Sequence, residues 1–313
     1  MGRYIIRRLL QAIPVLVGTT FLIFVIVYAL PGDPVAALGG ERPIDPVAAA
    51  RIREQFHLND PLLLRYWHYL QGILTGDFGT TLRGVSVSSM FQGKFQVTLQ
   101  LSITALVLEA VIGVGLGLWA AMRRGKWEDK AILAFTLIIV SVPTLVTGFV
   151  LQLLLGVQLK RSAGIDFFPV AGIGDGMRSY LLPGLVLAAL SIAYLTRLTR
   201  TSLMETFRAD FIRTAIAKGM PRRRVLGRHA LRNSMIPLVT YLGADLGTLM
   251  GGAVITETIF NLPGIGKQLF DSVYLRENDV VVGIVTVLVL VYILANLIVD
   301  MLYAVLDPRI RYE

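Results

Sequence analysis

The sequence has no cysteine, only three histidines and few charged residues. Without cysteine the chain has no disulfide framework, no thiolate metal site and no cysteine nucleophile. Only 16% of the residues are charged and 55% are apolar, and the mean hydropathy of +0.67 lies well above that of a soluble domain. This composition predicts an all-α integral membrane protein.

The few candidate catalytic side chains do not form a recognisable site. His57, His68 and His229 lack the spacing of metal ligands, and no histidine lies within an apolar run to activate a serine there. We therefore predict no catalytic residue, no metal site and no cofactor bound by this chain itself.

Six apolar runs are long enough to cross a membrane as helices. A hydrocarbon core about 30 Å thick needs roughly 20 residues at 1.5 Å per residue. The first run follows three arginines, as in a signal sequence, but it is too long for a signal and lacks a cleavage site, which favours an uncleaved anchor. The predicted spans are Leu9–Leu30, Val97–Ala121, Ala131–Leu155, Leu181–Thr199, Ile236–Ile259 and Val280–Leu306.

The distribution of lysine and arginine predicts the orientation of these spans. Cytoplasmic loops retain basic residues near helix ends, and alternate loops here are clearly richer in them, most of all the loop at residues 200–235. Both termini are therefore expected in the cytoplasm. Because topology explains the net charge of +9, we predict no nucleic-acid partner.

The predicted domains follow from this topology. Residues 1–30 form the amino terminus and first span, and residues 31–96 form a small extracytoplasmic subdomain with helical apolar spacing. Residues 97–306 form a five-helix core, and residues 307–313 form a cytoplasmic tail. In the subdomain Tyr66, Trp67 and Tyr69 are expected either at the lipid headgroups or packed within the subdomain.

Three segments resemble phosphate-binding motifs without matching them. Residues 77–79 read Asp-Phe-Gly without the other kinase motifs, and residues 264–267 lack the first glycine and the Ser or Thr of a Walker A loop. The third, at Gly113, Gly115 and Gly117, lies inside an apolar span without the strand that a dinucleotide turn requires. We interpret none of them as a nucleotide site.

Small residues recur at helical spacing in two spans. Gly243, Gly247 and Gly251 form one stripe in the fifth span, and Gly113 and Gly117 form another in the second. Since lipid gives helices no hydrophobic reason to associate, such stripes allow the close contact that does. We predict helix packing here, with the lining of a pathway as the alternative.

Three carboxyl groups fall within predicted spans, at Glu109, Asp245 and Asp300. An ionised carboxylate is costly there, so each is a functional candidate. Glu109 and Asp245 are candidates for a hydrated cavity or, alternatively, for a proton relay.

The loop at residues 200–235 is too long and too patterned for a bare connection. It reads as two short helices: Phe207, Phe211 and Ala215 lie on one stripe, and Gly219 ends the first helix. From charge alone the second helix would be an anchor on anionic lipid. Its basic residues are Arg222, Arg223, Arg224, Arg228 and Arg232.

The order of residues in this loop resembles the coupling (EAA) loop of permease subunits in ATP-binding-cassette importers of the dipeptide and oligopeptide permease family. "RTAIAKG" is followed after nine residues by "HALRNSMIP", and "LPGDP", "GDFG", "ETIFNLPGIG" and "DPRIR" extend the resemblance along the chain. Arg213 and Thr214 stand where the general consensus has Glu and Ala, and Ile216 stands where a basic residue is expected.

The resemblance implies the MetI-like fold of type I importer permeases, with six transmembrane helices in a bacterial plasma (inner) membrane. It also implies import of short peptides by alternating access. It implies a second similar permease, two cytoplasmic ATPases that hold ATP and Mg²⁺, and an extracytoplasmic binding protein. Ala215 and Gly219 would be small so that the coupling helix can seat in a groove of the ATPase. The coupling residues it implies are Arg213, Thr214, Ala215, Lys218, Gly219, Arg222, Arg223, His229 and Asn233.

Two alternatives belong to other classes. One is an ion-coupled secondary transporter that uses Glu109 or Asp245, and the other is a membrane scaffold that moves no solute. Within the importer interpretation, the sequence does not distinguish dipeptides from longer peptides, glutathione or nickel chelates.

Overall fold

Helices make up almost all of the described chain. The computed structural model describes residues 2–29, 35, 44–81 and 84–306, apart from the side chains of residues 2–5, 29, 222 and 299–306. Within these residues there is no β-strand, only an isolated bridge between Thr80 and Ser86. The predicted all-α class is confirmed.

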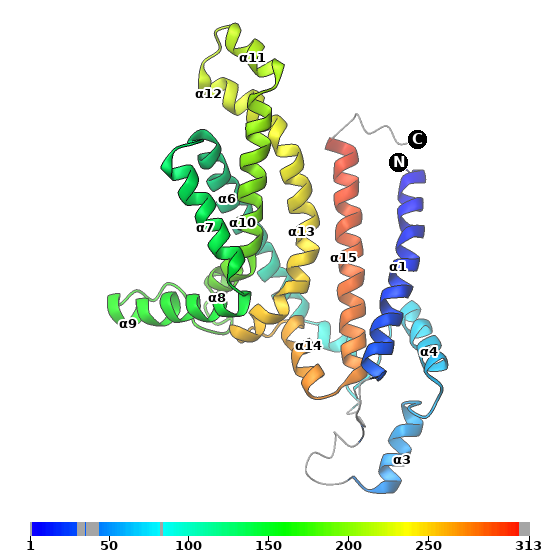
Figure 1. Ribbon diagram of the computed structural model, residues 1–313. Helices are drawn as coiled ribbons and strands as arrows, with labels where there is room; N and C mark the ends of the chain where they lie inside the picture. The colour runs from blue at the N-terminus through cyan, green and yellow to red at the C-terminus, as the bar shows by residue number, and fades with distance from the viewer. Residues whose placement is uncertain (1, 30–34, 36–43, 82–83, 307–313) are drawn as a thin grey trace.

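In the described part of the chain, five helices are long and apolar enough to cross a membrane. Helices α1 and α13 run in one direction and α6, α10 and α15 in the other, so that the start of α1 and the end of α15 lie at the same end of the molecule (Figure 1). Helices are the expected form because a bilayer offers no water to backbone N–H and C=O groups. The five are α1 (Gly2–Ala29), α6 (Lys94–Met122), α10 (Leu181–Phe207), α13 (Arg232–Ile259) and α15 (Asn278–Leu306).

The third predicted span, Ala131–Leu155, is not one straight helix. It is a pair of helical segments, Trp127–Ser141 and Thr144–Ala163, bent by 107°. Proline disfavours the helical conformation of the residue before it, and Val142, which precedes Pro143, is extended with φ −99° and ψ 126°. Of this pair, only α7 (Trp127–Ser141) therefore runs along the bundle. The second segment lies across the end of the bundle that is farther from the start of α1 (Figure 1).

The second arm of this bent pair consists of three consecutive helical pieces. It is fixed at the end of the bundle by Gln152, whose side-chain amide donates to the carbonyls of Val170 at 2.8 Å and Ile259 at 3.2 Å. The pieces are α8 (Thr144–Leu151), the π-helix η1 (Gln152–Gln158) and α9 (Leu159–Ala163).

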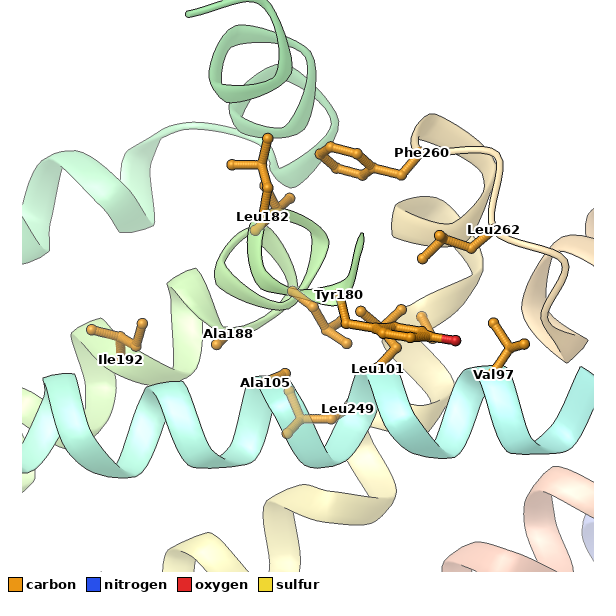
Figure 2. Close-up of a cluster of buried hydrophobic side chains, with 13 residues drawn as sticks. Val97, Leu101, Ala105, Tyr180, Leu182, Ala188, Ile192, Leu249, Phe260 and Leu262 are labelled. Atoms are coloured by element: carbon orange, nitrogen blue, oxygen red, sulfur yellow. The ribbon is translucent and has the colours of Figure 1, made fainter. Parts of the chain in front are cut away.

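The main core lies where α6, α10 and α13 meet. Figure 2 shows Leu101 of α6, Leu182 of α10 and Leu249 of α13 converging with Phe260, and all four side chains are buried. The chain enters α10 through the short 3₁₀ helix η2 (Gly176–Tyr180). Dispersion contacts between closely fitting side chains hold such a core together.

The segment before α6 is helical, as predicted, but it is not packed only on itself. Tyr66 donates to the carbonyl of Val17 at 2.8 Å and lies 2.9 Å from the Thr20 hydroxyl. Tyr69 donates to the Thr286 hydroxyl at 2.7 Å. The two tyrosines thus pack against α1 and α15, which neither of the expected arrangements anticipated. The helices of this segment are α3 (Pro46–Gln55), α4 (Leu62–Thr75) and α5 (Val87–Phe91).

Candidate functional site

The predicted coupling loop forms a compact unit at the end of the bundle where α1 begins. It extends beyond α10 as α11 and α12 and returns into α13 (Figure 1). A π-helix is rare and is frequently found at functional sites, and one leads into α13 here. The elements are α11 (Asp210–Ala217), α12 (Arg222–Arg224) and the π-helix η3 (Val225–Leu231).

One face of α11 is buried inside this chain. Ile212 and Ala215 are 1% and 4% exposed and pack with Leu203 of α10 and Val225 of η3. The expected stripe of Phe207, Phe211 and Ala215 is therefore wrong. Ala215 is small because it fits against its own chain, and it does not lie on the outer surface, where the sequence interpretation placed it.

The rest of the α11 surface is exposed and partly apolar. Phe211 is 45% and Ile216 is 60% exposed. Arg213 also belongs to this surface and lies 3.6 Å from Asp210, with both side chains largely in solvent. The Thr214 hydroxyl is used locally, since it donates to the carbonyl of Asp210 at 3.0 Å. Two apolar side chains that the sequence interpretation did not assign thus stand out on the free surface of α11.

Gly219 ends α11 in a left-handed conformation. Lys218 caps the helix, and Gly219 follows with φ +73°. A Cβ on Gly219 would meet no described atom within 4 Å. Glycine is thus favoured here by backbone conformation, because other residues rarely adopt positive φ.

The second half of the loop carries its charges on the surface. Arg223 is exposed, His229 is half-buried and Asn233 is exposed. The Asn233 side-chain amide donates to the His229 carbonyl at 2.7 Å. Asn233 therefore stabilises the junction between the π-helix and α13. The side chain of Arg222 lies outside the described residues.

Two of the predicted intramembrane carboxyl groups face each other. Glu109 of α6 is 0% exposed and Asp245 of α13 is 7% exposed, and their side chains interact. Among the described residues neither has an ion-pair partner, and the Glu109 oxygens find no hydrogen-bond donor. Glu109 therefore does not line an open cavity in this conformation. The side chain of Asp300 lies outside the described residues.

The glycines of the two stripes differ in their surroundings. A Cβ on Gly117 would lie 2.5 Å from the Thr196 carbonyl oxygen of α10, and one on Gly113 would lie 3.0 Å from the Leu195 Cβ. A Cβ on Gly247 would lie 2.4 Å from the Tyr292 ring of α15, whereas one on Gly251 would meet nothing. Three glycines thus meet a neighbouring helix closely. Gly243 is half-buried one turn before Gly247.

A buried ion pair links α7 and α10, and the sequence interpretation missed it. Arg200 donates to both oxygens of Asp129, at 2.6 and 2.9 Å, and the backbone N–H of Gly125 donates to the same carboxylate at 2.9 Å. The Asp129 side chain is 4% exposed. Acidic residues in the first turn of a helix interact favourably with its dipole, and that position is the signal that could have identified Asp129.

No group of three metal-ligating side chains comes together in the described part of the chain. His57 and His68 stack with ring centroids 5.6 Å apart, and His57 lies 3.1 Å from Asp60. The motifs "LPGDP" and "DPRIR" lie outside the described residues.

Comparisons with known families cover nearly the whole chain. The family described as "binding-protein-dependent transport system inner membrane component" matches residues 113–312, and the model of its N-terminal region matches residues 1–97.

Curated relatives match along their full length. The dipeptide transport system permease protein DppB of Escherichia coli K12 is 36% identical over 338 residues, covering 100% of both chains. The glutathione transport system permease protein GsiC of Salmonella choleraesuis is 37% identical over 314 residues, also covering 100% of both.

Solved structures share the fold at low sequence identity. The MetNI methionine ABC transporter in an inward-facing conformation matches with a TM-score of 0.55 and 18% identity, over 70% of this chain and 96% of that one. A crystal structure of an amino acid ABC transporter with histidines matches with a TM-score of 0.52 and 17% identity. The chain therefore has the predicted MetI-like importer permease fold.

Proposed function

This chain belongs to the family of binding-protein-dependent transport system inner membrane components, and we propose that it imports short peptides, driven by partner ATPases. The observation that carries the proposal is full-length identity of 36–37% to dipeptide and glutathione permeases. The exposed unit of α11 to η3 supports it, because a permease without an ATP site needs a surface on which an ATPase can act. The chain itself binds no ATP or Mg²⁺ in this mechanism.

The proposed complex contains this chain, a second homologous permease, two cytoplasmic ABC ATPases and an extracytoplasmic substrate-binding protein. The exposed apolar Phe211 and Ile216, with the surrounding arginines, are suited to a groove on the ATPase. The end of the bundle that carries this unit, together with the start of α1 and the end of α15, is then the cytoplasmic end. Movement of α11 would be transmitted to α10 and α13, to which the unit is directly joined.

The composition of the native complex tests this proposal. The tagged chain, purified from its own membrane in mild detergent, is expected to bring a second permease and ATPase subunits in fixed proportion. A chain that is reproducibly recovered alone, with uptake that follows an ion gradient, would contradict the proposal and favour a secondary transporter.

A further inference from the structure

A buried carboxylate lies at the end of α13 that is farther from the coupling segment, by which we mean α11, α12 and η3. Glu257 is 0% exposed and lies two residues before the end of α13 at Ile259. Its Oε1 accepts a hydrogen bond of 2.6 Å from the Thr98 hydroxyl of α6. Its Oε2 accepts one of 2.8 Å from the backbone N–H of Lys267 in α14 (Ile265–Tyr274).

The turn before α14 is shaped around this carboxylate. A Cβ on Gly264 would lie 2.2 Å from Oε1 of Glu257, and one on Gly266 would lie 2.7 Å from the Val254 Cα and 3.0 Å from Oε2 of Glu257. Residues 264–267 are the segment that resembles the end of a phosphate-binding loop. The loop does bind an anion, but the anion is a side chain of the same protein.

Glu257 and Thr98 together satisfy the free amides at the start of α14. The first N–H groups of a helix have no partner within it and favour an anion. Gly264 at the cap position has no side chain to supply one. The Thr98 hydroxyl instead accepts from the Ile265 N–H at 2.9 Å, while Glu257 accepts from Lys267.

These bonds join α14 to the same helix that leaves the coupling segment. α13 begins at Arg232, directly after η3, and continues without a break to Ile259. α14 lies between the outer ends of α13 and α15 (Figure 1). Because a buried acceptor is costly to leave without its partner, these hydrogen bonds hold α14 to the end of α13.

We propose that Glu257 is a positioning residue that makes α14 move with α13, so that a displacement at the coupling segment reaches the opposite end of the transport pathway. The proposal rests on the proposed function, in which partner ATPases drive the coupling segment. Glu257 contacts no substrate in this mechanism. It acts through α14, whose Phe270, Val273 and Tyr274 side chains are exposed at that end.

The first test compares uptake with ATP hydrolysis in the reconstituted complex with its binding protein. Both oxygens of Glu257 accept hydrogen bonds, so Glu257→Gln places an amide N–H group where one of these donors now points. Thr98→Val removes the hydroxyl that donates to Glu257. Both variants are expected to assemble and hydrolyse ATP normally, while the peptide moved per ATP falls about tenfold. The double variant should move as much peptide per ATP as the poorer single variant, because both substitutions disrupt the same hydrogen-bond network.

Two matched variants serve as controls. Thr256→Val removes a buried hydroxyl, one residue from Glu257, that has no hydrogen-bond partner among the described residues. This variant should leave the amount of peptide moved per ATP unchanged. Thr98→Ser keeps the hydroxyl and should behave as the native chain. In Thr98→Val, assembly, ATP hydrolysis and uptake could instead fall together, with the amount of peptide moved per ATP unchanged. Glu257 and Thr98 would then serve stability alone, and the proposal would be wrong.

A second readout needs no substrate and therefore separates this proposal from the proposed function. Spin labels are placed on Ile255 of α13 and Tyr274 of α14, which are 47% and 83% exposed. In the native complex the distribution of distances between the two labels should be the same with and without ATP. In Glu257→Gln this distribution should broaden or shift. An equally narrow, unchanged distance in the variant would overturn the proposal even if peptide uptake fails.

Discussion

The structure assigns Gly219 a conformational role that its size alone does not explain. Its φ of +73° is in the left-handed region, and the space around it is open. Asn adopts that region more readily than Ala, and β-branched residues adopt it least. The sequence interpretation, in which Gly219 is small to admit a partner, predicts the reverse order for Ala and Asn.

Substitutions at Gly219 distinguish the two explanations. We predict that uptake decreases in the order Gly219→Asn, Gly219→Ala, Gly219→Val, with Ala costing about 1–2 kcal/mol in the local conformation. Uptake in whole cells at equal membrane levels measures this. Higher uptake by the Ala variant than by the Asn variant would show that side-chain size decides.

The contact between Glu109 and Asp245 also concerns single residues. Two buried carboxyl groups in contact cannot both be ionised cheaply, and no basic partner was found for them in the described chain. An importer driven by partner ATPases has no need of a charge at this place. A transporter coupled to an ion gradient through this pair does need it.

We predict that Glu109→Gln keeps ATP-driven uptake within about twofold of the native rate. The variant should also be more stable to heat, because the substitution removes a buried acid and its amide can donate to Asp245. The gain in the free energy of unfolding should be roughly 1–3 kcal/mol. Asp245→Asn is the matched control and should behave alike. Loss of uptake in a well-assembled Glu109→Gln complex would support the ion-coupled alternative.

Among the elements, α11 has the most specific role in the proposed mechanism, because its buried and its exposed side chains have different roles. Ile212 is buried and holds α11 against α10, whereas Ile216 is 60% exposed. A substitution at the buried position should therefore affect the fold of the loop, and one at the exposed position should affect the partner.

We predict that Ile216→Asp lowers the yield of co-purified ATPase at least tenfold, which corresponds to about 1.4 kcal/mol or more of binding energy. The chain itself should remain stable. Ile173→Asp changes another exposed isoleucine, 41% exposed, next to Gly172, which donates to the Phe260 carbonyl just past the far end of α13. This variant should retain the ATPase. Ile212→Ala should instead destabilise the chain by about 2–5 kcal/mol in thermal unfolding.

The helices themselves could largely be predicted because apolar length is a strong signal in lipid. The failures have two causes. The bend in the third span did have a local signal, Val142 before Pro143, but the apolar run masked it. The other failures concern packing between residues that are far apart in the sequence. Tyr66 packs on α1 from 46 residues away in sequence, and Ala215 packs inward, and neither arrangement follows from local periodicity.

Less of the candidate site could be predicted than of the fold. The coupling loop was recognised by the order of its residues, but its outward residues Phe211 and Ile216 were not. Asp129 with Arg200 and Glu257 with Thr98 join residues 71 and 159 positions apart. Such pairs depend on how helices cross, which a single sequence does not encode visibly.

At the scale of the whole molecule, helices that cross the membrane place the two ends of the bundle on opposite sides of it. Because the chain has no cysteine, single cysteines report their location without background. Leu74 of α4 is 88% exposed near one end, and Arg223 is exposed at the other.

We predict that Leu74→Cys reacts with a membrane-impermeant maleimide in intact spheroplasts, whereas Arg223→Cys reacts only after the membrane is opened. The native chain serves as the blank. Labelling in the opposite order would reverse the orientation and place the coupling segment away from cytoplasmic ATPases.

The central claim is that this chain moves peptides with energy from ATP bound elsewhere. The most direct measurement is uptake of a labelled dipeptide and of glutathione by the purified complex in proteoliposomes, with binding protein outside and ATP sealed inside. The mechanism predicts accumulation of one or both that requires internal ATP and persists when ion gradients are collapsed. Accumulation that ignores ATP and disappears with an ion gradient would contradict it.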